Sequence, residues 1–188
     1  VAGMRAVLRL AEQLGAIVDH RASEVSFANL RAMQRAGWVT ATFAEVRNRA
    51  DLLLFFGTDG GPQREVLERR LFAPPVTLSG DEPPARRRIF IGPRMQRTRA
   101  EIALPWPAEE LHIAAALLRA HINGQRLSTL RLRARTAARL EQIGEALRAA
   151  RYAVIVWDAA ALPAEIAELA ISNLAGLLLA LNRKTRAV

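Results

Sequence analysis

The sequence contains no cysteine, three histidines and one lysine, Lys184, among 188 residues. The absence of cysteine excludes disulfides, zinc–thiolate sites and cysteine-ligated iron–sulfur clusters within this chain. The histidines are far apart: His112 and His121 are expected to point in different directions from one helix, and His20 follows a predicted strand. His20 is either a ligand or catalytic residue or a plain loop residue. We expect no metal site.

Long hydrophobic runs are also absent. The longest apolar stretch, residues 174 to 181, is too short to span a bilayer and belongs to an amphipathic pattern, so no transmembrane helix and no membrane partner are predicted. The N-terminus lacks the layout of a signal peptide, and we expect a cytoplasmic protein. Hydrophobic residues make up 51% of the chain, which is ample for a core.

The net charge of +9 comes almost entirely from arginine. A high isoelectric point alone does not indicate nucleic acid, and no pattern matches a nucleic-acid-binding module, so no nucleic-acid partner is expected. Arginine suits bidentate contacts with carboxylates and phosphates, which leaves an acidic partner open. The alternating Arg131, Arg133 and Arg135 would align three guanidinium groups if the chain there were extended. They form either a solvated surface or a binding site for an acidic partner or polycarboxylate.

Predicted strands and helices alternate along the chain. This pattern favours an α/β fold, doubly wound, with a mainly parallel sheet and helices on both faces. The division predicted is a first α/β half at 1–73, a Pro/Gly-rich connector at 74–87 and a second α/β half at 88–188. Strands are expected at 16–19, 51–56, 88–92, 100–104 and 152–157, and helices at 1–14, 26–35, 62–71, 108–122, 136–150 and 163–182.

The loop after the predicted strand 51–56 is the main candidate site. It reads Gly57-Thr58-Asp59-Gly60-Gly61-Pro62, between a strand and a helix. Glycines there would let backbone N–H groups approach an anion, but the loop is neither Gly-x-Gly-x-x-Gly nor a P-loop. It is therefore either an anion-binding turn or a tight turn only. Asp59 and Asp158 both follow strands and would form an acid/base pair only if the two strands were neighbours.

Two blocks of the sequence resemble a known family. LAEQLGAIVDHRAS and TATFAEVRNRADLLLFFGT are similar to the B subunit of formylmethanofuran dehydrogenase, in the molybdopterin oxidoreductase superfamily. The signature positions are Leu14 to Asp19, followed by Thr40, Thr42, Glu45, Val46, Asn48, Arg49, Ala50, Asp51 and Gly57. The later YAVIVWDAA and LNRKTRA resemble the second Rossmann-type half of that family.

The departures from the family pattern are as informative as the matches. The family's metal subunit needs a cysteine or selenocysteine, which this chain lacks, and the Gly-x-Asn-Pro after the strand is replaced by Gly57-Thr58-Asp59-Gly60. These four residues are therefore interpreted as a vestigial cofactor loop, with no molybdopterin or iron–sulfur cofactor and no catalytic residue expected. The chain is also short for a complete subunit and begins with Val, so we expect sequence to be missing upstream.

Such losses resemble the B-type subunit of the formyltransferase/hydrolase complex of methylotrophic bacteria. The resemblance implies a non-catalytic structural component in tetrahydromethanopterin- and methanofuran-linked one-carbon metabolism, with the sibling A, C and D subunits as partners. The furan carriers of this family have glutamate-rich tails, and from charge alone we hypothesise that Arg131, Arg133 and Arg135 hold such a tail. The alternatives are a pterin-containing oxidoreductase component and a stand-alone module that binds a nucleotide or acidic ligand.

Overall fold

Strand β1 (Leu52–Phe56) is buried along its whole length at the centre of the sheet. It pairs in parallel with β2 (Arg87–Gly92) on one side and with β4 (Tyr152–Trp157) on the other. A strand covered on both faces needs apolar side chains at every position, and the run of two phenylalanines after three leucines supplies them. The prediction of a buried parallel strand here is confirmed.

The computed structural model describes residues 2–19, 23–72, 85–93, 100–127, 130 and 132–188. These residues build a five-stranded sheet in the order β3-β2-β1-β4-β5, in which every pairing is parallel. The outer strands are β3 (Ile102–Pro105) and β5 (Arg186–Ala187). The α/β class with a parallel sheet is confirmed, and the short β5 was not predicted.

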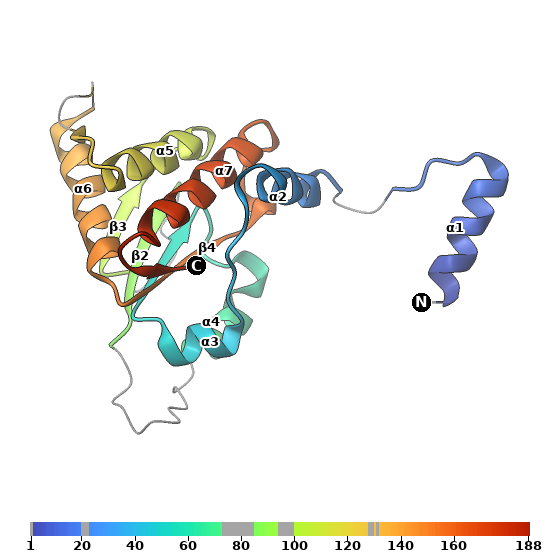
Figure 1. Cartoon of the computed structure of the whole chain (residues 1–188), viewed down its shortest axis with the longest axis horizontal. Helices are drawn as coiled ribbons and strands as arrows, with labels where there is room; N and C mark the ends of the chain where they lie inside the picture. The colour runs from blue at the N-terminus through green and yellow to red at the C-terminus, as the bar shows by residue number, and fades with distance from the viewer. Residues whose placement is uncertain (1, 20–22, 73–84, 94–99, 128–129, 131) are drawn as a thin grey trace.

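Helices cover both faces of this sheet (Figure 1). One face packs against α2 (Ser23–Ala36), α5 (Leu111–Ile122), α6 (Ala134–Ala149) and α7 (Ala164–Leu181). The other face, which includes Leu53, Phe55 and Val154, packs against α3 (Phe43–Arg49) and α4 (Arg64–Phe72). The sheet is thus doubly wound, with the larger core on the side of α5 and α7.

The N-terminal region differs most from the prediction. Helix α1 (Ala2–Leu14) forms as expected, but it projects away from the rest of the molecule (Figure 1). The strand predicted at residues 16–19 is wrong: this segment is irregular and exposed, with Ile17 97% exposed. A short apolar run becomes a strand only when a neighbouring strand pairs with it, and no described strand lies beside this one.

Helix α2 begins at Ser23, three residues earlier than predicted, and ends before Gly37, whose φ of 75° provides the expected stop. The helical period of Phe27, Leu30 and Met33 predicts that they face inward, but this is wrong, because these side chains are 40–45% exposed. The buried positions are instead small residues, Ala28 and Ala32. Small side chains allow α2 to approach α7 closely.

Strands from both predicted halves join one sheet. Strand β1 comes from residues 1–73, and its two neighbours come from residues 88–188. Most of the predicted connector at 74–87 lies outside the described residues, and Arg87 already belongs to β2. The boundary between the halves stays a prediction.

Helix α7 is long and apolar enough to cross a membrane by length and composition alone, and it is the one such helix in the described part of the chain. The same composition is typical of a central helix in a folded core. Eight of its residues are buried, and it packs against α2 and α5, which accounts for its hydropathy.

Asp51 links the amino ends of the central strands. Its carboxylate accepts hydrogen bonds from the backbone N–H groups of Arg151 and Tyr152, at 2.8 and 2.9 Å, where β4 begins. Its backbone carbonyl accepts a hydrogen bond from the N–H of Arg87 at 2.8 Å, where β2 begins. Asp51 is therefore a structural residue that joins the amino ends of three strands.

Replacing Asp51 by Ala removes both side-chain hydrogen bonds and leaves the N–H of Tyr152 without its partner. We expect Asp51→Ala to lower the free energy of unfolding by about 1–3 kcal/mol, measured by urea denaturation. Glu12→Ala, which removes an exposed carboxylate from α1, is the matched control and should leave this value unchanged. Equal effects of the two variants would contradict the assigned role.

Candidate functional site

The candidate site lies at the carboxyl edge of the sheet, between β1 and β4. From β1 the chain order runs one way through β2 and β3, and β4 and β5 lie on the other side. Such a reversal of strand order opens a crevice where α/β proteins bind ligands. Phe56 pairs with Trp157, so the loops after β1 and β4 leave the sheet side by side.

Gly57 makes the turn out of β1 possible. Its φ is 71°, and a Cβ atom there would lie 3.0 Å from side-chain carbons of both Leu111 and Leu162. Its N–H donates to the carbonyl of Ile91 at 2.7 Å. Backbone conformation and space both require glycine at this position.

The polar groups of the loop are satisfied within the loop. Thr58 Oγ1 accepts a hydrogen bond from the N–H of Gly60, and Asp59 Oδ1 accepts one from the N–H of Gly61, both at 3.0 Å. Asp59 Oδ2 also lies 3.6 Å from a guanidinium nitrogen of Arg64. An anion bound here would have to compete with these side chains for the backbone N–H groups.

Beside this loop is a crevice of about 500 Å³. Its end wall contains Trp38 and Trp157, whose ring centroids are 5.3 Å apart, and Trp157 Nε1 donates to Asn29 Oδ1 at 3.2 Å. Most of the remaining lining is apolar, and it includes residues of α3, α4 and β4. The full lining is Asn29, Trp38, Val39, Thr40, Ala41, Phe43, Val46, Thr58, Gly60, Gln63, Leu67, Leu71, Val154, Ile155, Val156, Trp157, Asp158 and Val188.

The crevice has an acidic group and no basic one. Among the described residues that line it, Asp158 has the sole charged side chain. Asp59 and Asp158 do lie at the same edge of neighbouring strands, but Asp158 Oδ1 accepts a hydrogen bond from the N–H of Ala160 at 3.0 Å, and Asp59 serves its own turn. Both carboxylates stabilise local turns, and the geometry suits an uncharged ligand better than an anion.

The predicted arginine site is elsewhere. Helix α6 begins at Ala134, so Arg135 is helical and the extended chain that would align three guanidinium groups is not present at this residue. Arg133 precedes the helix as its N-cap, and Arg131 lies outside the described residues. Arg133 and Arg135 are both exposed, at the start of α6, which packs on the opposite face of the sheet from α3 (Figure 1).

The histidines do not form a site in the described structure. His20 lies outside the described residues, and His121 Nε2 contacts Glu145 Oε1 at 3.0 Å, a contact between α5 and α6. Glu109 and His112 have Glu-x-x-His spacing, but the described residues contain no group of three His, Cys, Asp or Glu that could hold a metal ion.

Comparison with known proteins gives similarity over nearly the whole chain. The chain is 31% identical, over 187 residues, to the B subunit of the formyltransferase/hydrolase complex Fhc of Methylorubrum extorquens. Its structure matches a chain in the crystal structure of the formyltransferase/hydrolase complex (FhcABCD) of that organism with methylofuran, with a TM-score of 0.74, 32% identity and 97% of this chain covered. The chain is therefore similar to this B subunit along nearly its whole length. No family model matches it.

A shorter match confirms the resemblance to the B subunit of formylmethanofuran dehydrogenase. Over 52 residues the chain is 40% identical to the B subunit of the tungsten-containing formylmethanofuran dehydrogenase 2 of Methanocaldococcus jannaschii. The matched region is 28% of this chain and 12% of that protein. The chain spans about half the length of the Methylorubrum protein, 48% in both the sequence and the structure comparison.

Residues of this chain that match the family signature have structural roles. Thr42 is the N-cap of α3, and its Oγ1 accepts a hydrogen bond from the N–H of Glu45 at 3.2 Å. Glu45 hydrogen-bonds the hydroxyl of Tyr152, and Asp51 holds the start of β4. The contact between Glu45 and Tyr152 joins α3 to β4, and two other residues of the signature, Thr40 and Val46, line the crevice.

The lining residues do not fit a pterin dinucleotide. Such a cofactor carries a pyrophosphate, which needs free N–H groups or cations at the carboxyl edge. Here the N–H groups of Gly60 and Gly61 are bonded to Thr58 and Asp59, and the guanidinium group of Arg64 at this edge lies 3.6 Å from Asp59. Among the described residues, the lining of the crevice has a carboxylate and no arginine. The chain also has no thiolate to offer a metal.

The contact between Trp38 and Trp157 was not predicted from the sequence. Trp38 and Trp157 belong to segments separated by more than half of the chain, and only the packing of α2 beside the end of β4 brings them together. The one available signal was scarcity: the sequence has three tryptophans, and Trp157 ends a strand at the edge where ligands bind.

Tyr152 is the single tyrosine of the chain, so its ionisation can be followed by ultraviolet absorbance. Burial, followed by its hydrogen bond to Glu45, raises the pKa of Tyr152 from 10.0 to about 12. Since the folded-state pKa is higher, this group stabilises the fold fully below pH about 10 and loses that contribution as the pH rises towards 12.

We expect Glu45→Gln to lower the pKa of Tyr152 while burial keeps it above 10.0. Arg49→Gln is the matched control of opposite sign, because the charge of Arg49 lowers this pKa. A spectrophotometric titration of folded and urea-unfolded protein measures both. A midpoint in the folded protein equal to that of the unfolded chain would contradict the burial and the Glu45 contact.

Proposed function

We propose that this chain is a non-catalytic structural component of a formyltransferase/hydrolase complex in one-carbon metabolism, in the position of the B subunit. The observation that carries the proposal is the similarity over 97% of the chain, at 32% identity and a TM-score of 0.74, to a chain of the FhcABCD structure. Its partners are then the sibling A, C and D subunits. Its pathway is the formaldehyde-to-formate oxidation linked to tetrahydromethanopterin and methanofuran.

The absence of catalysis and of a cofactor belongs to the same proposal. It is supported by the Gly57 loop, in which Thr58 and Asp59 occupy the backbone N–H groups that a phosphate would need. It is also supported by the structural roles of Thr42, Glu45 and Asp51. A pterin-containing oxidoreductase component would need a cation or N–H groups that can bind its phosphates, and Arg64 at this edge pairs with Asp59.

The crevice beside Trp38 and Trp157 favours one second interpretation, a stand-alone module that binds a small planar ligand. Its volume of about 500 Å³ is within the range of small-molecule sites, and its lining is largely apolar. Stable association with sibling subunits separates the two interpretations, because only the structural component requires it.

Contact with a furan carrier is a further part of the proposal. The solved FhcABCD structure contains methylofuran, and the glutamate-rich tail implied by the family resemblance calls for a positive surface. Arg133 and Arg135 are exposed, have no ion pair among the described residues, and begin a helix whose first turn has no acidic residue. The positive end of the helix dipole adds to their charge, so this surface attracts carboxylates.

A cytoplasmic location follows from this assignment to a cytoplasmic pathway. Its support in the molecule is α7, whose apolar length is accounted for by packing against α2 and α5.

Affinity purification of the tagged protein from its native host, with mass spectrometry of all retained proteins, tests the proposal. We expect stoichiometric recovery of the formyltransferase and amidohydrolase-like subunits, without a pterin absorbance or bound molybdenum or tungsten. Recovery of the protein alone would overturn the structural role and favour the stand-alone module. A bound metal with a pterin spectrum would favour the oxidoreductase.

Removal of the arginine charges should weaken binding of the carrier by the complex. We expect Arg133→Gln/Arg135→Gln to reduce affinity by roughly threefold to tenfold at low salt, since exposed ion pairs contribute about 0.2–1 kcal/mol each. Adding Arg131→Gln should reduce it further, and the differences should shrink at high salt. Arg5→Gln/Arg9→Gln on α1 removes the same charge and should have no effect. Unchanged affinity at low salt would exclude this surface.

A further inference from the structure

A second cavity, of about 330 Å³, lies near the amino edge of the sheet, beside the start of β4. Three segments form it: the turn after α5, the last turn of α6, and the turn that links α7 to β5. Three cations, Arg148, Arg183 and Lys184, are among its lining residues, and none of the lining residues is acidic. Its chemistry is therefore the reverse of that of the crevice beside Asp158.

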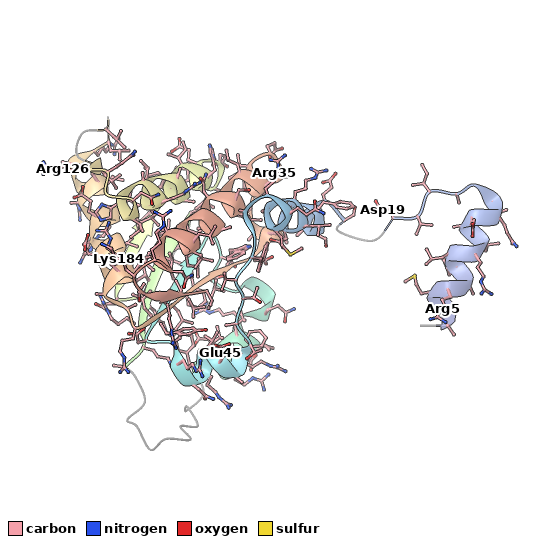
Figure 2. The ribbon with its side chains drawn as sticks, in the orientation of Figure 1. Arg5, Asp19, Arg35, Glu45, Arg126 and Lys184 are labelled. Atoms are coloured by element: carbon pink, nitrogen blue, oxygen red, sulfur yellow. The ribbon has the colours of Figure 1, made fainter. Side chains whose placement is uncertain are left out.

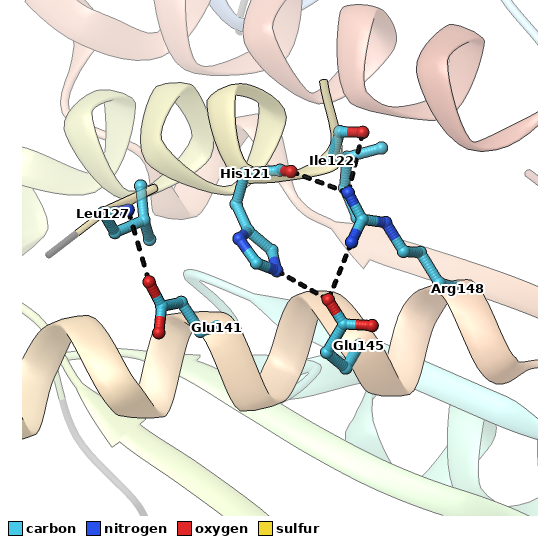
Figure 3. Close-up of polar contacts among 6 residues, drawn as sticks. All are labelled: His121, Ile122, Leu127, Glu141, Glu145 and Arg148. Carbon is cyan, nitrogen blue, oxygen red and sulfur yellow. Dashed lines mark hydrogen bonds and ion pairs between the residues drawn. The ribbon is translucent and has the colours of Figure 1, made fainter. Parts of the chain in front are cut away.

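The carbonyl groups at the C-terminal end of α5 do not repel an anion from this cavity, because they are hydrogen-bonded. Helix C-termini carry partial negative charge on unpaired carbonyls, which repels anions. Here the guanidinium group of Arg148 donates to the carbonyls of His121 and Ile122, at 2.7 and 3.0 Å, and its other nitrogen lies 2.7 Å from Glu145 Oε1 (Figure 3). Arg148 thus neutralises the end of α5, and Glu145 and His121 hold it in place.

The carbonyl groups at the C-terminal end of α7 also have hydrogen-bond donors. The N–H groups of Lys184 and Thr185 both donate to the carbonyl of Leu181, at 3.0 Å, and Asn182 Nδ2 donates to the carbonyl of Leu178 at 2.9 Å. The hydroxyl of Thr185 donates to the carbonyl of Ala150. The turn between α7 and β5 is therefore fixed by its own hydrogen bonds.

Two charged side chains at this cavity have no partner among the described residues. Arg183 and Lys184 are exposed, and neither makes an ion pair or a side-chain hydrogen bond within that part of the structure. Lys184 is on the main body of the protein, far from α1 (Figure 2). By contrast, Arg148 at this cavity and Arg64 beside the crevice are both engaged. The rigid turn thus presents a guanidinium and an ammonium group to one hollow.

We propose that this basic cavity binds a small polyanion, with phosphate or clustered carboxylate groups, through Arg183 and Lys184. The planar guanidinium group of Arg183 supplies two parallel N–H donors, and Lys184 adds a compact positive charge. The cavity is large enough for a small phosphorylated or polycarboxylate molecule. This inference does not depend on the proposed place of the chain in a complex.

The single lysine gives a direct test. A brief reaction with an amine-specific acylating reagent modifies Lys184 and the N-terminal amine, and peptide mass spectrometry measures each separately. Pyrophosphate and citrate serve as probes, with sodium chloride at equal ionic strength as reference. We expect either probe to protect Lys184 in a saturable manner while the N-terminal amine reacts as before. Tighter binding of pyrophosphate indicates a phosphate ligand, and tighter binding of citrate a carboxylate ligand.

Substitutions separate a built site from general attraction. We expect Arg183→Gln and Lys184→Gln each to weaken calorimetric binding of the better probe by about tenfold or more, the effect of a charge-assisted hydrogen bond. Arg186→Gln is the matched control, because Arg186 is exposed in the same segment but does not line the cavity. Protection no greater than with sodium chloride, or equal weakening by all three substitutions, would overturn the proposal.

Discussion

The pairing of β1 with β4 is the constraint on which the rest of this structure depends. Each residue of β1 from Leu52 to Phe56 is matched in register with one of β4. At the amino end, the two N–H groups bound by Asp51 fix that register, and a shift of one residue would turn every side chain to the other face. The same register brings Thr58 and Asp158 to one crevice at the carboxyl end.

The opposite, amino edge of the sheet is shaped by the pairing of β4 with β5. The chain that leaves α7 must return to β4 to form β5, and the tight turn at residues 182–185 makes that return. The two edges thus differ in kind. The carboxyl edge is apolar, walled by tryptophans and mildly acidic, and the amino edge carries positive charge at its cavity. Folding brings Arg148, Arg183 and Lys184, which come from two different segments of the chain, together at one cavity.

Analysis of the sequence predicted the interior of the protein well and its outer parts poorly. Strands β1, β2 and β4 and helices α5, α6 and α7 were predicted close to their true bounds, because their apolar runs and periodicity reflect burial. The same reasoning failed for Phe27, Leu30 and Met33, which are exposed although they follow a helical period. Periodicity reports an amphipathic helix but not which neighbour covers it. The Trp38–Trp157 contact and the Arg183–Lys184 hollow depend on distant segments, which no local pattern encodes.

The separation of α1 from the body of the protein affects its sensitivity to proteases. The segment from Gly15 to Asp19 is exposed and makes few backbone hydrogen bonds to described residues, so a protease can bind it in an extended form without unfolding anything else. Cleavage there would separate α1 from the rest of the chain and leave every described strand intact. Limited digestion would therefore leave a folded product that keeps both cavities.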